Sequence, residues 1–333
     1  MKTNILYIER KFWEFVSIEK VFRQIAENLS YEKYQYSFKQ MPFGNGFAEI
    51  LKNLIFFRKS SADVYHITGH IHYISLVLPR KKTILTIHDL GFLHTRNGLR
   101  RYLIKKLFLD LPVKKLKYIT AISETTKQEI IEQTKCAEDK IRLIENPLRD
   151  FKNQNKIGFN KDCPTILQIG TSPNKNLAYL IKAIEGISCN LRIIGKLNEN
   201  LLSKLKISNI KYSNVFDLGD DEIEEEYRTA DIVSFCSTYE GFGLPIIEAQ
   251  AMKTPVITSN LSPMREVAGG AAVLVNPKQP ESIREGILKL IEKDDFREDL
   301  IIKGIENVKR YDPIKIVNQY ENLYRELIEN KNG

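Results

Sequence analysis

Short apolar runs alternate with helical stretches along nearly all of the chain, and this alternation constrains the fold more than any other feature. The strand-like runs of the first half are NILYI, ADVYHI, KTILTI and LKYITAI. Those of the second half are TILQI, NLRIIG, DIVSFC, PVITS and AAVLV, followed by helical stretches over 279–293 and 295–309. Such alternation is typical of parallel sheets covered by helices. The sequence therefore predicts an α/β fold.

A polar stretch with little periodicity, LRDFKNQNKIGFNKD, interrupts the alternation in the middle of the chain. A chain of 333 residues is long enough for two domains of about 150 residues each. We therefore expect an N-terminal domain over 1–150 and a second domain over 151–312. Residues 313–333 are expected to form a C-terminal helix that can pack back on the N-terminal domain, because their apolar residues recur at helical spacing.

The segment STYEGFGLPIIEAQAM combines a glycine-rich turn, the start of a helix and two acidic residues. Pro245 suits the first turn of a helix because its missing N–H would be unpaired there. A glycine-rich turn between a strand and a helix directs backbone N–H groups and the positive end of the helix dipole toward one place, which favours a phosphate. Glu240 and Glu248, with seven residues between them, can accept hydrogen bonds from neighbouring hydroxyl groups. A nucleotide sugar carries hydroxyls on both sides of a diphosphate and fits this pair.

A second turn supports the same interpretation. The run TILQI ends in GTSPNKN, and a helix follows, so Lys175 is expected at the carboxyl end of a strand, where ligands of open α/β sheets bind. A lysine there would neutralise a diphosphate through charge-assisted hydrogen bonds of about 1.5–3 kcal/mol each. The alternative interpretation is a pair of connector turns with a lysine at the surface.

The two segments together resemble a known family. The run YRTADIVSFCSTYEGFGLPIIEAQAMKTPVITSNLSPMREVAGGAAVLVNP is similar to the donor-binding half of the family 4 retaining glycosyltransferases, and QIGTSPNKN is similar to their diphosphate loop. The combination is far more specific than a lone Gly-x-Gly. The resemblance implies a GT-B fold, in which two Rossmann-like domains with parallel sheets face a central cleft that closes on the donor.

The resemblance also implies roles for single residues. Glu248 would hold the nucleotide ribose, Glu240 the transferred sugar together with the amides of the turn, and Lys175 the diphosphate. The family usually has a second basic residue in the diphosphate loop, where this chain has Thr171 and Asn174. The clamp is therefore either weaker here or completed by Lys196. The other residues expected at the donor are Gly170, Thr171, Gly241, Phe242, Gly243 and Leu244.

All five histidines of the chain fall between positions 66 and 94. His70 and His72 are spaced as a metal-binding pair, but no well-spaced third ligand is evident, and metal sites normally have three or four. His66 and His88 end strand-like runs and are expected at the carboxyl edge of the first sheet, as structural histidines or as part of a site. The segment TIHDLGFL is similar to the first-domain motif of the family, whose histidine contacts the transferred sugar, which implies that role for His88. Asp89 is expected to orient its ring.

The implied activity is transfer of a hexose from a UDP-, GDP- or similar nucleotide sugar to a hydroxyl of a glycan or lipid-linked glycan, as in lipopolysaccharide or capsule biosynthesis. The anomeric configuration would be retained, and the catalytic residues would be Glu240, His88 and Lys175. No Asp-x-Asp triplet occurs in the sequence, which agrees with a metal-independent enzyme whose fixed positive groups stabilise the developing charge. No cofactor is expected.

Positive charge is concentrated in the first half, where residues 52–117 hold 14 Lys and Arg against three Asp, a net charge of +11. On a helix, an apolar stripe that includes Leu99 and Leu103 is expected to cover the sheet. The basic residues beside it are either a solvated face or a surface that docks on anionic lipid, where each contributes about 1 kcal/mol. Nucleic acid is not expected, because the segment has no aromatic stacking platform. The full stripe is Leu99, Tyr102, Leu103, Leu107 and Leu111. The expected membrane or acceptor surface is Arg96, Arg100, Arg101, Lys105 and Lys106.

Other features bound the location and the alternatives. No apolar run is long enough to span a bilayer and none resembles a signal peptide, so we expect a cytoplasmic protein, free or peripheral on the cytoplasmic face of the membrane. The four cysteines have no paired spacing and are expected to be reduced thiols. NILYI is followed by no glycine-rich fingerprint, which disfavours an NAD enzyme. The remaining alternatives are a sugar-nucleotide epimerase, a phosphorylase, and a non-catalytic module that binds a nucleotide sugar or scaffolds a membrane assembly.

Overall fold

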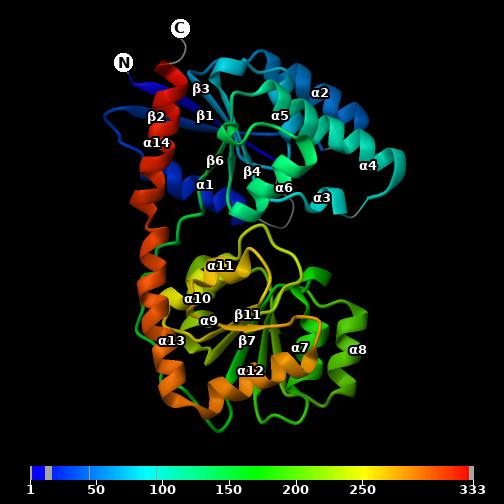
Figure 1. The fold of residues 1–333 in the computed structure, drawn as a ribbon, viewed down its shortest axis with the longest axis vertical. Coiled ribbons are helices and arrows are strands. Elements are labelled where there is room, and N and C mark those ends of the chain that lie inside the picture. Colours follow the sequence, from blue (N-terminus) through cyan, green and yellow to red (C-terminus); the bar gives the residue numbers. More distant parts are fainter. Residues whose placement is uncertain (1, 12–16, 45, 95, 330–333) are drawn as a thin grey trace. The chain divides into compact units, whose positions relative to one another are not determined.

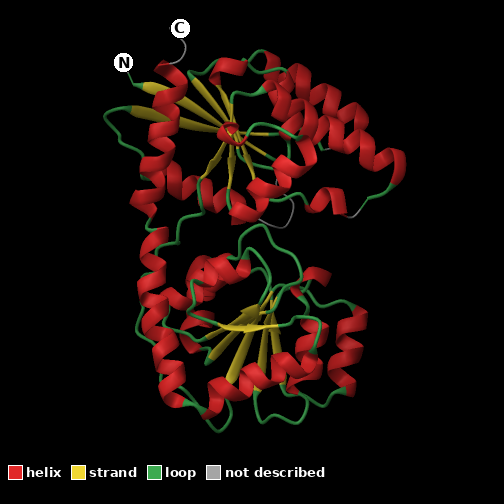
Figure 2. Cartoon of the chain, viewed as in Figure 1, coloured by secondary structure: helices red, strands yellow, loops and turns green. Residues whose placement is uncertain are grey.

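The computed structural model describes residues 2–11, 17–44, 46–94 and 96–329. They form two compact units, each built on one sheet of six parallel strands. Unit 1 contains the residues up to Pro147 together with those from Tyr311 onward, and unit 2 is Leu148–Arg310. Figure 1 labels the elements and Figure 2 separates helices from strands. The predicted fold of two Rossmann-like domains with parallel sheets is confirmed.

The sheet of unit 1 has the order β2-β1-β3-β4-β5-β6, and every neighbouring pair is parallel. Its strands are β1 Thr3–Glu9, β2 Tyr34–Gln40, β3 Val64–Ile67, β4 Thr83–Ile87, β5 Tyr118–Ala121 and β6 Ile141–Leu143. The four inner strands correspond to the apolar runs in the sequence. The two edge strands, which the sequence pattern missed, are partly exposed and carry polar residues, because an edge strand need not be apolar on both faces.

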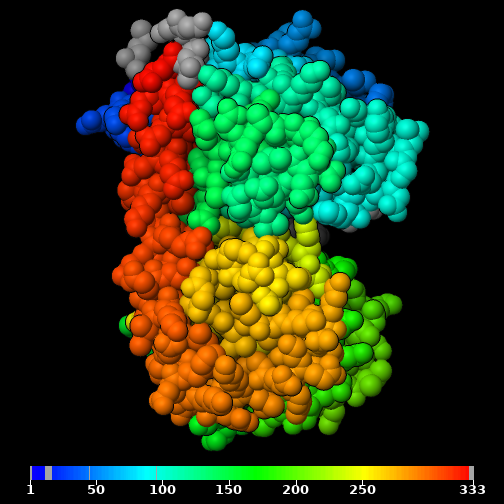
Figure 3. Space-filling view, viewed as in Figure 1, coloured from blue at the N-terminus to red at the C-terminus, as the bar shows by residue number. Residues whose placement is uncertain are grey.

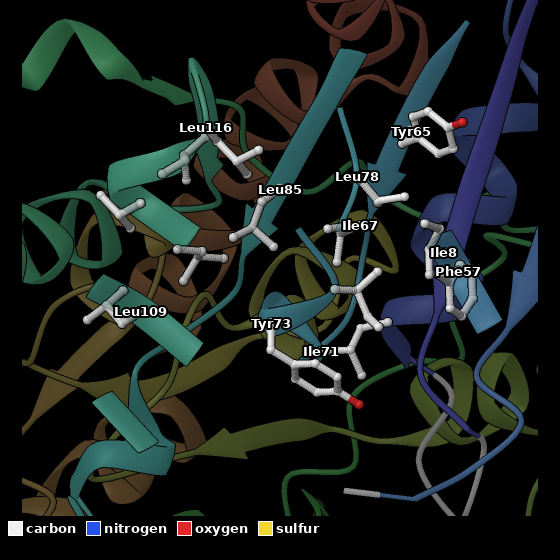
Figure 4. Close-up of a cluster of buried hydrophobic side chains, with 14 of the residues drawn as sticks. Ile8, Phe57, Tyr65, Ile67, Ile71, Tyr73, Leu78, Leu85, Leu109 and Leu116 are labelled. Carbon is white, nitrogen blue, oxygen red and sulfur yellow. The ribbon is translucent and has the colours of Figure 1, made fainter. Parts of the chain in front are cut away.

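The α-helices of unit 1 are α1 Ser17–Glu27, α2 Phe47–Arg58, α3 Gly91–His94, α4 Gly98–Lys105, α5 Leu111–Lys115, α6 Glu124–Thr134 and α14 Pro313–Glu329. The shorter turns are the 3-10 segments η1 His72–Leu76, η2 Arg80–Lys82 and η4 Glu138–Lys140, and the π-helical turn η3 Lys106–Asp110, which joins α4 to α5. A buried cluster of aliphatic and aromatic side chains holds strands and helices together, and Figure 4 labels ten of its members.

The C-terminal helix α14 packs on the sheet of unit 1 through a buried polar network. The hydroxyl of Tyr324 lies 3.0 Å from the hydroxyl of Tyr7 and 2.7 Å from Nδ1 of His66. The other ring nitrogen of His66 lies 2.8 Å from the hydroxyl of Thr86. The helix buries the residues that recur at helical spacing, namely Ile316, Val317, Tyr320, Leu323, Tyr324 and Leu327.

The sheet of unit 2 has the order β12-β11-β10-β7-β8-β9, again with parallel neighbours only. Its strands are β7 Thr165–Ile169, β8 Asn190–Ile194, β9 Tyr212–Val215, β10 Ile232–Phe235, β11 Val256–Ser259 and β12 Val273–Val275. Its helices are α7 Leu177–Ile184, α8 Glu199–Ile207, α9 Asp220–Thr229, α10 Leu244–Ala251, α11 Met264–Ala268, α12 Pro280–Glu292 and α13 Asp294–Asn307, with the 3-10 turns η5 Pro173–Lys175 and η6 Val308–Tyr311.

This strand order has one switch point, between β7 and β10. The chain first adds β8 and β9 on one side of β7 and then returns to add β10, β11 and β12 on the other side. Open α/β sheets bind ligands at the carboxyl ends of the strands that flank such a switch point, which here are β7 and β10. Both glycine-rich segments singled out in the sequence are loops of this switch point.

Candidate functional site

The centre of the candidate site is an ion pair between the two loops of the switch point. Nζ of Lys175, on the loop after β7, lies 2.7 Å from Oε1 of Glu240, on the loop after β10. The side chains are 22% and 14% exposed, so the pair is shielded but open to solvent on one side. The ammonium group also lies 4.7 Å from the centre of the Phe235 ring. The structure thus brings together two residues that the sequence separates by 65 positions.

Asn174 joins the same two loops beside the ion pair. Its side-chain amide donates to the carbonyl oxygen of Tyr239 at 3.0 Å and to Oε1 of Glu240 at 3.2 Å. Its own carbonyl accepts from the backbone N–H of Thr238 at 2.8 Å. Glu240 is therefore held by a neutral donor as well as by a cation, and it keeps an orientation toward the loop after β7.

Gly170 makes room for the lysine. Its φ of +86° is in the left-handed region, and a Cβ atom built there would lie 2.9 Å from Cγ of Lys175. The aliphatic part of the lysine side chain thus lies directly over the glycine, and any larger residue would displace it. Gln168 donates from its side-chain amide to the carbonyl oxygens of Gly170 and Lys175, which fixes the loop from inside.

The loop after β8 contributes Lys196 to the neighbourhood of this turn. The hydroxyl of Thr171 donates to the backbone carbonyl of Lys196 at 2.6 Å, and a Cβ atom on Gly195 would meet the Thr171 side chain at 3.0 Å. The ammonium group of Lys196 lies 5.8 Å from the centre of the Phe216 ring. Thr171 therefore tethers the Lys196 backbone to the loop after β7.

The turn after β10 leads into α10 in the way that the sequence predicts. Gly243 is the N-cap of the helix, with a φ of +120°, and Pro245 lies in the first turn. Phe242 is 3% exposed and anchors the turn in the core, while Gly241 and Leu244 are partly exposed. The first N–H groups of a helix have no partner within the helix and carry partial positive charge. Here Pro245 has no N–H and Ile246 donates to the Gly243 carbonyl at 2.9 Å, so the start of α10 contributes mainly the positive end of its dipole to the loop that also carries Glu240.

Glu248, one turn into α10, has a hydrogen-bond donor that the sequence did not reveal. The hydroxyl of Tyr227, at the end of α9, donates to Oε2 of Glu248 at 2.5 Å. Tyr227 is fully buried, and its pKa is raised well above its usual value by burial and by the neighbouring carboxylate. Tyr227 therefore remains a hydroxyl donor and orients one carboxylate oxygen of Glu248. Because the residues lie on different helices, no local pattern could have connected them.

At the carboxyl edge of the sheet of unit 1, the histidines are fixed by the backbone. His88 follows β4, is 4% exposed, and donates from Nε2 to the carbonyl oxygen of Thr68 at 2.8 Å. Burial lowers its pKa to about 4, so the ring is neutral at pH 7 and Nδ1 carries a lone pair. Asp89 lies 3.6 Å from His70 rather than beside the His88 ring, so the prediction that Asp89 orients His88 is wrong. The Thr68 carbonyl has that role.

His70 and His72 do not act as a pair. Burial would raise the pKa of Asp89, but the contacts with His70 and with the N–H of Gly91 lower it to about 2, which leaves His70 beside a carboxylate. His72 is fully buried and donates from Nδ1 to the Phe108 carbonyl at 2.6 Å. Within the residues that the structure describes, no group of three or more His, Cys, Asp or Glu side chains is placed to hold a metal ion.

The helical segment over 98–115 differs from its prediction. Leu99, Tyr102, Leu103 and Leu111, which were expected to cover the sheet, are exposed, and of the predicted stripe only Leu107 packs against the core. The π-helical turn η3 holds one more residue per turn than an α-helix, so a stripe drawn at a spacing of 3.6 residues loses register there. The residues that face the core are Ile104, Leu107, Phe108, Leu109, Pro112 and Val113.

The five basic residues expected at a membrane or acceptor surface fall into two groups. Arg100 and Lys106 are exposed. Arg96 and Arg101 donate to the backbone carbonyls of Phe92 and Leu93, and Lys105 binds Asp110 and the carbonyl of Gln133. These three are partly buried and stabilise the fold locally. No helix among the described residues is both long enough and apolar enough to cross a bilayer.

Comparison with known proteins identifies the family. The profile described as "Glycosyltransferase Family 4" matches residues 22–149, and the profile "Glycosyl transferases group 1" matches residues 150–307. The chain belongs to the family 4 glycosyltransferases. It is 26% identical over 290 residues to the O-antigen chain mannosyltransferase B of Escherichia coli, which covers 77% of this chain and 74% of the relative. It is 29% identical over 250 residues to the O-antigen chain mannosyltransferase RfbU of Salmonella typhimurium. This match covers 72% of this chain and 67% of the relative.

The same fold occurs in solved glycosyltransferase structures. The structure of Anabaena Alr3699/HepE in complex with UDP-glucose superposes with a TM-score of 0.80 at 15% identity and covers 97% of this chain and 100% of that one. The structure of WaaG, a glycosyltransferase involved in lipopolysaccharide biosynthesis, superposes with a TM-score of 0.74 at 13% identity. The superposition covers 96% of this chain and 99% of that one. The GT-B fold that the sequence predicted is therefore confirmed.

Proposed function

We propose that this glycosyltransferase moves a hexose from a nucleoside diphosphate sugar to a hydroxyl group of a glycan, with retention of the anomeric configuration. The observation that carries the proposal is the ion pair of Lys175 and Glu240 at the switch point, where the partly exposed start of α10 follows Glu240 on the same loop. A cation, a carboxylate and a helix N-terminus at one edge of the sheet supply the groups that a sugar diphosphate requires.

In the ligand-free protein Lys175 and Glu240 satisfy each other, so we expect them to exchange partners when the donor binds. The diphosphate would take the ammonium group of Lys175, and Glu240 would then accept hydrogen bonds from hydroxyls of the sugar. Asn174 would keep Glu240 oriented during this exchange, because the hydrogen bond that its side-chain amide donates to the carboxylate does not depend on the lysine. Glu248, which the hydroxyl of Tyr227 orients, would accept a hydrogen bond from the ribose.

The reaction balances without an external base. The bond between the anomeric carbon and the diphosphate oxygen breaks, and a bond from the acceptor oxygen to the same carbon forms on the same face. The acceptor proton passes to the leaving diphosphate. Lys175 and the positive end of the α10 dipole stabilise the charge that develops on that leaving group. These fixed positive groups support a metal-independent reaction.

His88 is suited to accept a hydrogen bond from a substrate hydroxyl. Its Nε2–H is committed to the Thr68 carbonyl, and its neutral ring presents Nδ1 as an acceptor at neutral pH. A protonated histidine would offer only donors. We therefore assign to His88 a neutral, positioning contact with the transferred sugar.

The comparisons guide the choice of substrates. The two relatives named above are O-antigen chain mannosyltransferases, and a structural neighbour binds UDP-glucose. We propose mannose as the first sugar to test, with glucose as the second, and an oligosaccharide of a bacterial surface polysaccharide as acceptor. An acceptor that is lipid-linked would place the reaction at a membrane.

The deciding experiment is thermal unfolding of the protein with a panel of UDP- and GDP-linked mannose and glucose, followed by an assay for nucleoside diphosphate release with acceptor. A donor at 100 times its dissociation constant stabilises by about 2.7 kcal/mol. Lys175→Ala should weaken that donor about tenfold or more, since a charge-assisted bond is lost. Lys182→Ala, an exposed lysine on α7, is the matched control. Donor binding without any turnover would mean that the protein is a nucleotide-sugar-binding module and not an enzyme. Absence of donor binding would contradict the proposed donor site.

A further inference from the structure

His70 and Asp89 form a histidine–carboxylate pair at the carboxyl edge of the sheet of unit 1. His70 lies on the loop after β3, and Asp89 lies on the loop after β4. Nε2 of His70 is 3.6 Å from Oδ2 of Asp89. The other carboxylate oxygen of Asp89 accepts from the backbone N–H of Gly91 at 2.7 Å. One oxygen of the carboxylate is therefore fixed by the backbone, and the other faces the imidazole.

The carboxylate determines which ring nitrogen of His70 carries the proton. Burial raises the pKa of Asp89, but the contacts with His70 and with the N–H of Gly91 lower it to about 2, so the group is ionised at neutral pH. An ionised carboxylate only accepts hydrogen bonds, so Nε2 is the nitrogen that donates and Nδ1 keeps a lone pair. A separation slightly longer than a hydrogen bond is common for such pairs before a substrate binds.

The ring of His70 is held in place without being enclosed. It lies beside the rings of His72, His88 and Phe92, with ring centres 6.0, 6.3 and 6.3 Å away. Within the residues that the structure describes, Nε2 of His70 is buried and has no hydrogen-bond partner. The side chain is nevertheless 32% exposed, so solvent reaches it through its other atoms. Nδ1, on the other side of the ring, is the nitrogen left for a ligand.

The other four histidines lack this combination. Three of them are nearly or fully buried. The fourth, His94, lies 3.7 Å from a carboxylate oxygen of Glu129 and is 54% exposed. It ends α3, and Figure 3 shows the cyan atoms of this part of the chain at the surface of unit 1. His70 is thus the histidine that joins a carboxylate partner and a packed ring to an open side.

We propose that Nδ1 of His70 accepts a hydrogen bond from a non-reacting hydroxyl of the acceptor glycan, and that Asp89 positions the ring for this contact. The inference rests on the proposed function, which supplies a glycan as the second substrate. That function gives the hydroxyls of the donor partners in Glu240, Glu248 and His88 and leaves the acceptor glycan without one. A neutral imidazole suits an uncharged hydroxyl, because its lone pair needs no counter-charge.

The ring of Phe92 adds an apolar surface beside this nitrogen. Phe92 is partly buried and packs against the core of unit 1. Binding sites for small molecules combine such apolar surfaces with a few polar groups that fix the orientation of the ligand. Because the hydroxyl that meets His70 does not react, its proton stays in place, and the proton of the attacking hydroxyl still passes to the diphosphate. His70 would therefore contribute to binding and Asp89 would act through it.

The role of Asp89 is testable without any substrate. Long-range proton–nitrogen correlation spectra of protein labelled in its histidines should show His70 with a proton on Nε2 and none on Nδ1. The signal is identified by its loss in His70→Ala. In Asp89→Asn the side-chain oxygen keeps the N–H of Gly91 and the amide then faces the ring, so the proton should move to Nδ1. A proton on Nδ1 in the wild type, or the same tautomer in both proteins, would overturn this role.

Kinetics with an acceptor test the contact itself. The assay follows nucleoside diphosphate release from the donor found by thermal unfolding, with methyl α-mannoside and α-linked mannobiose as acceptor probes. His70→Ala should raise the acceptor KM about fivefold, as expected for one neutral hydrogen bond, with little change in kcat or in the donor KM. His70→Asn, whose oxygen can replace Nδ1, should restore most of the loss. Asp89→Asn should raise the acceptor KM less, and not at all when combined with His70→Ala.

The matched control is His94→Ala with Glu129→Gln, which removes the other histidine–carboxylate pair of unit 1 and should leave the acceptor KM unchanged. Turnover with an unchanged acceptor KM in His70→Ala would overturn the inference and leave the proposed function intact. So would a rise confined to the donor KM, since it would place His70 at the transferred sugar. Donor binding without turnover of either probe would contradict the proposed function and the glycan contact together, while the spectra would still report on His70 and Asp89.

Discussion

The candidate side chains at the carboxyl edges of the two sheets, Lys175 with Glu240 in unit 2 and His88 in unit 1, are held in different ways. In unit 2 the edge holds charged residues that bind each other across two loops, with Lys175 and Glu240 partly exposed. In unit 1 the edge holds His88, which is buried, neutral and fixed by the Thr68 carbonyl. Two side chains that bind each other can each take a ligand group as a new partner. A histidine ring that is hydrogen-bonded to the backbone keeps its orientation. The difference agrees with the proposal that unit 2 would bind the charged part of the donor and that His88 of unit 1 would position a hydroxyl group.

Lowering the pH should have the largest and most unequal effect on the two units, because only unit 1 contains histidines. Burial lowers the pKa of His66 and His72 to about 3 and that of His88 to about 4, below the ordinary value of 6.5. The unfolded chain therefore takes up protons first as the pH falls below 6.5, and unit 1 loses stability at about 1.4 kcal/mol per pH unit for each of the three histidines. Between pH 7 and pH 5 the loss should reach several kcal/mol.

Hydrogen exchange of the whole chain, read by peptide masses, checks this prediction. Peptides of unit 1 should lose protection at pH 5 relative to pH 7 after correction for the intrinsic exchange rate, and peptides of unit 2 should not. In unit 2 burial lowers the pKa of Lys156 to about 8. The contribution of this group to stability therefore falls as the pH decreases from 10.5 to 8 and is constant below pH 8. His72→Asn, which keeps a donor for Phe108, should reduce the acid effect in unit 1. An equal loss of protection in both units would contradict the assignment of the acid effect to the buried histidines of unit 1.

Glu240→Gln should have the largest effect on catalysis. If the carboxylate stabilises the transition state of sugar transfer, its replacement by a neutral amide lowers turnover about 100-fold, with a smaller change in donor affinity. The measurement is kcat together with the donor dissociation constant. Glu185→Gln, at the end of α7, tests for a general effect of charge. A change confined to affinity would mean that Glu240 contributes only to ground-state binding.

Gly170→Ala should weaken donor binding about tenfold, because the new Cβ would collide with the Lys175 side chain and move its ammonium group. Gly186→Ala is a close control for backbone strain. Gly186 has a φ of +74°, but a Cβ atom there meets nothing within 4 Å. Calorimetric titration of both variants with the donor separates the two effects. Similar losses in the two variants would show that strain, and not the displaced lysine, is responsible.

Tyr227→Phe should give the smallest effect, a loss of about 1 kcal/mol in the free energy of unfolding of unit 2, because one hydrogen bond to Glu248 is removed. Donor affinity should fall a few-fold, since the carboxylate is no longer held. Thermal unfolding with and without nucleoside diphosphate measures both quantities. Tyr31→Phe, at a tyrosine that is 83% exposed, is the control. An unchanged affinity for the nucleoside diphosphate would contradict the proposed contact between Glu248 and the nucleotide.

The sequence by itself determined the features that depend on neighbouring residues. Runs of apolar residues predicted the buried inner strands, because such strands are covered on both faces, and Gly243 with Pro245 predicted the turn into α10. The same reasoning missed the edge strands β2, β6 and β9, whose partly exposed faces allow polar residues. It also predicted the wrong buried face for the helical segment over 98–115, where a π turn shifts the register.

Only the tertiary structure decided which of these local features meet. The order of strands brings Lys175 to Glu240 and helix packing brings Tyr227 to Glu248, over separations of 65 and 21 residues. Glu240 could be predicted to bind a ligand from its turn, but its pairing with Lys175 and Asn174 could not. The physical reason is that turn and strand patterns record local burial and backbone geometry, whereas the partner of a charged side chain is set by the topology of the sheet.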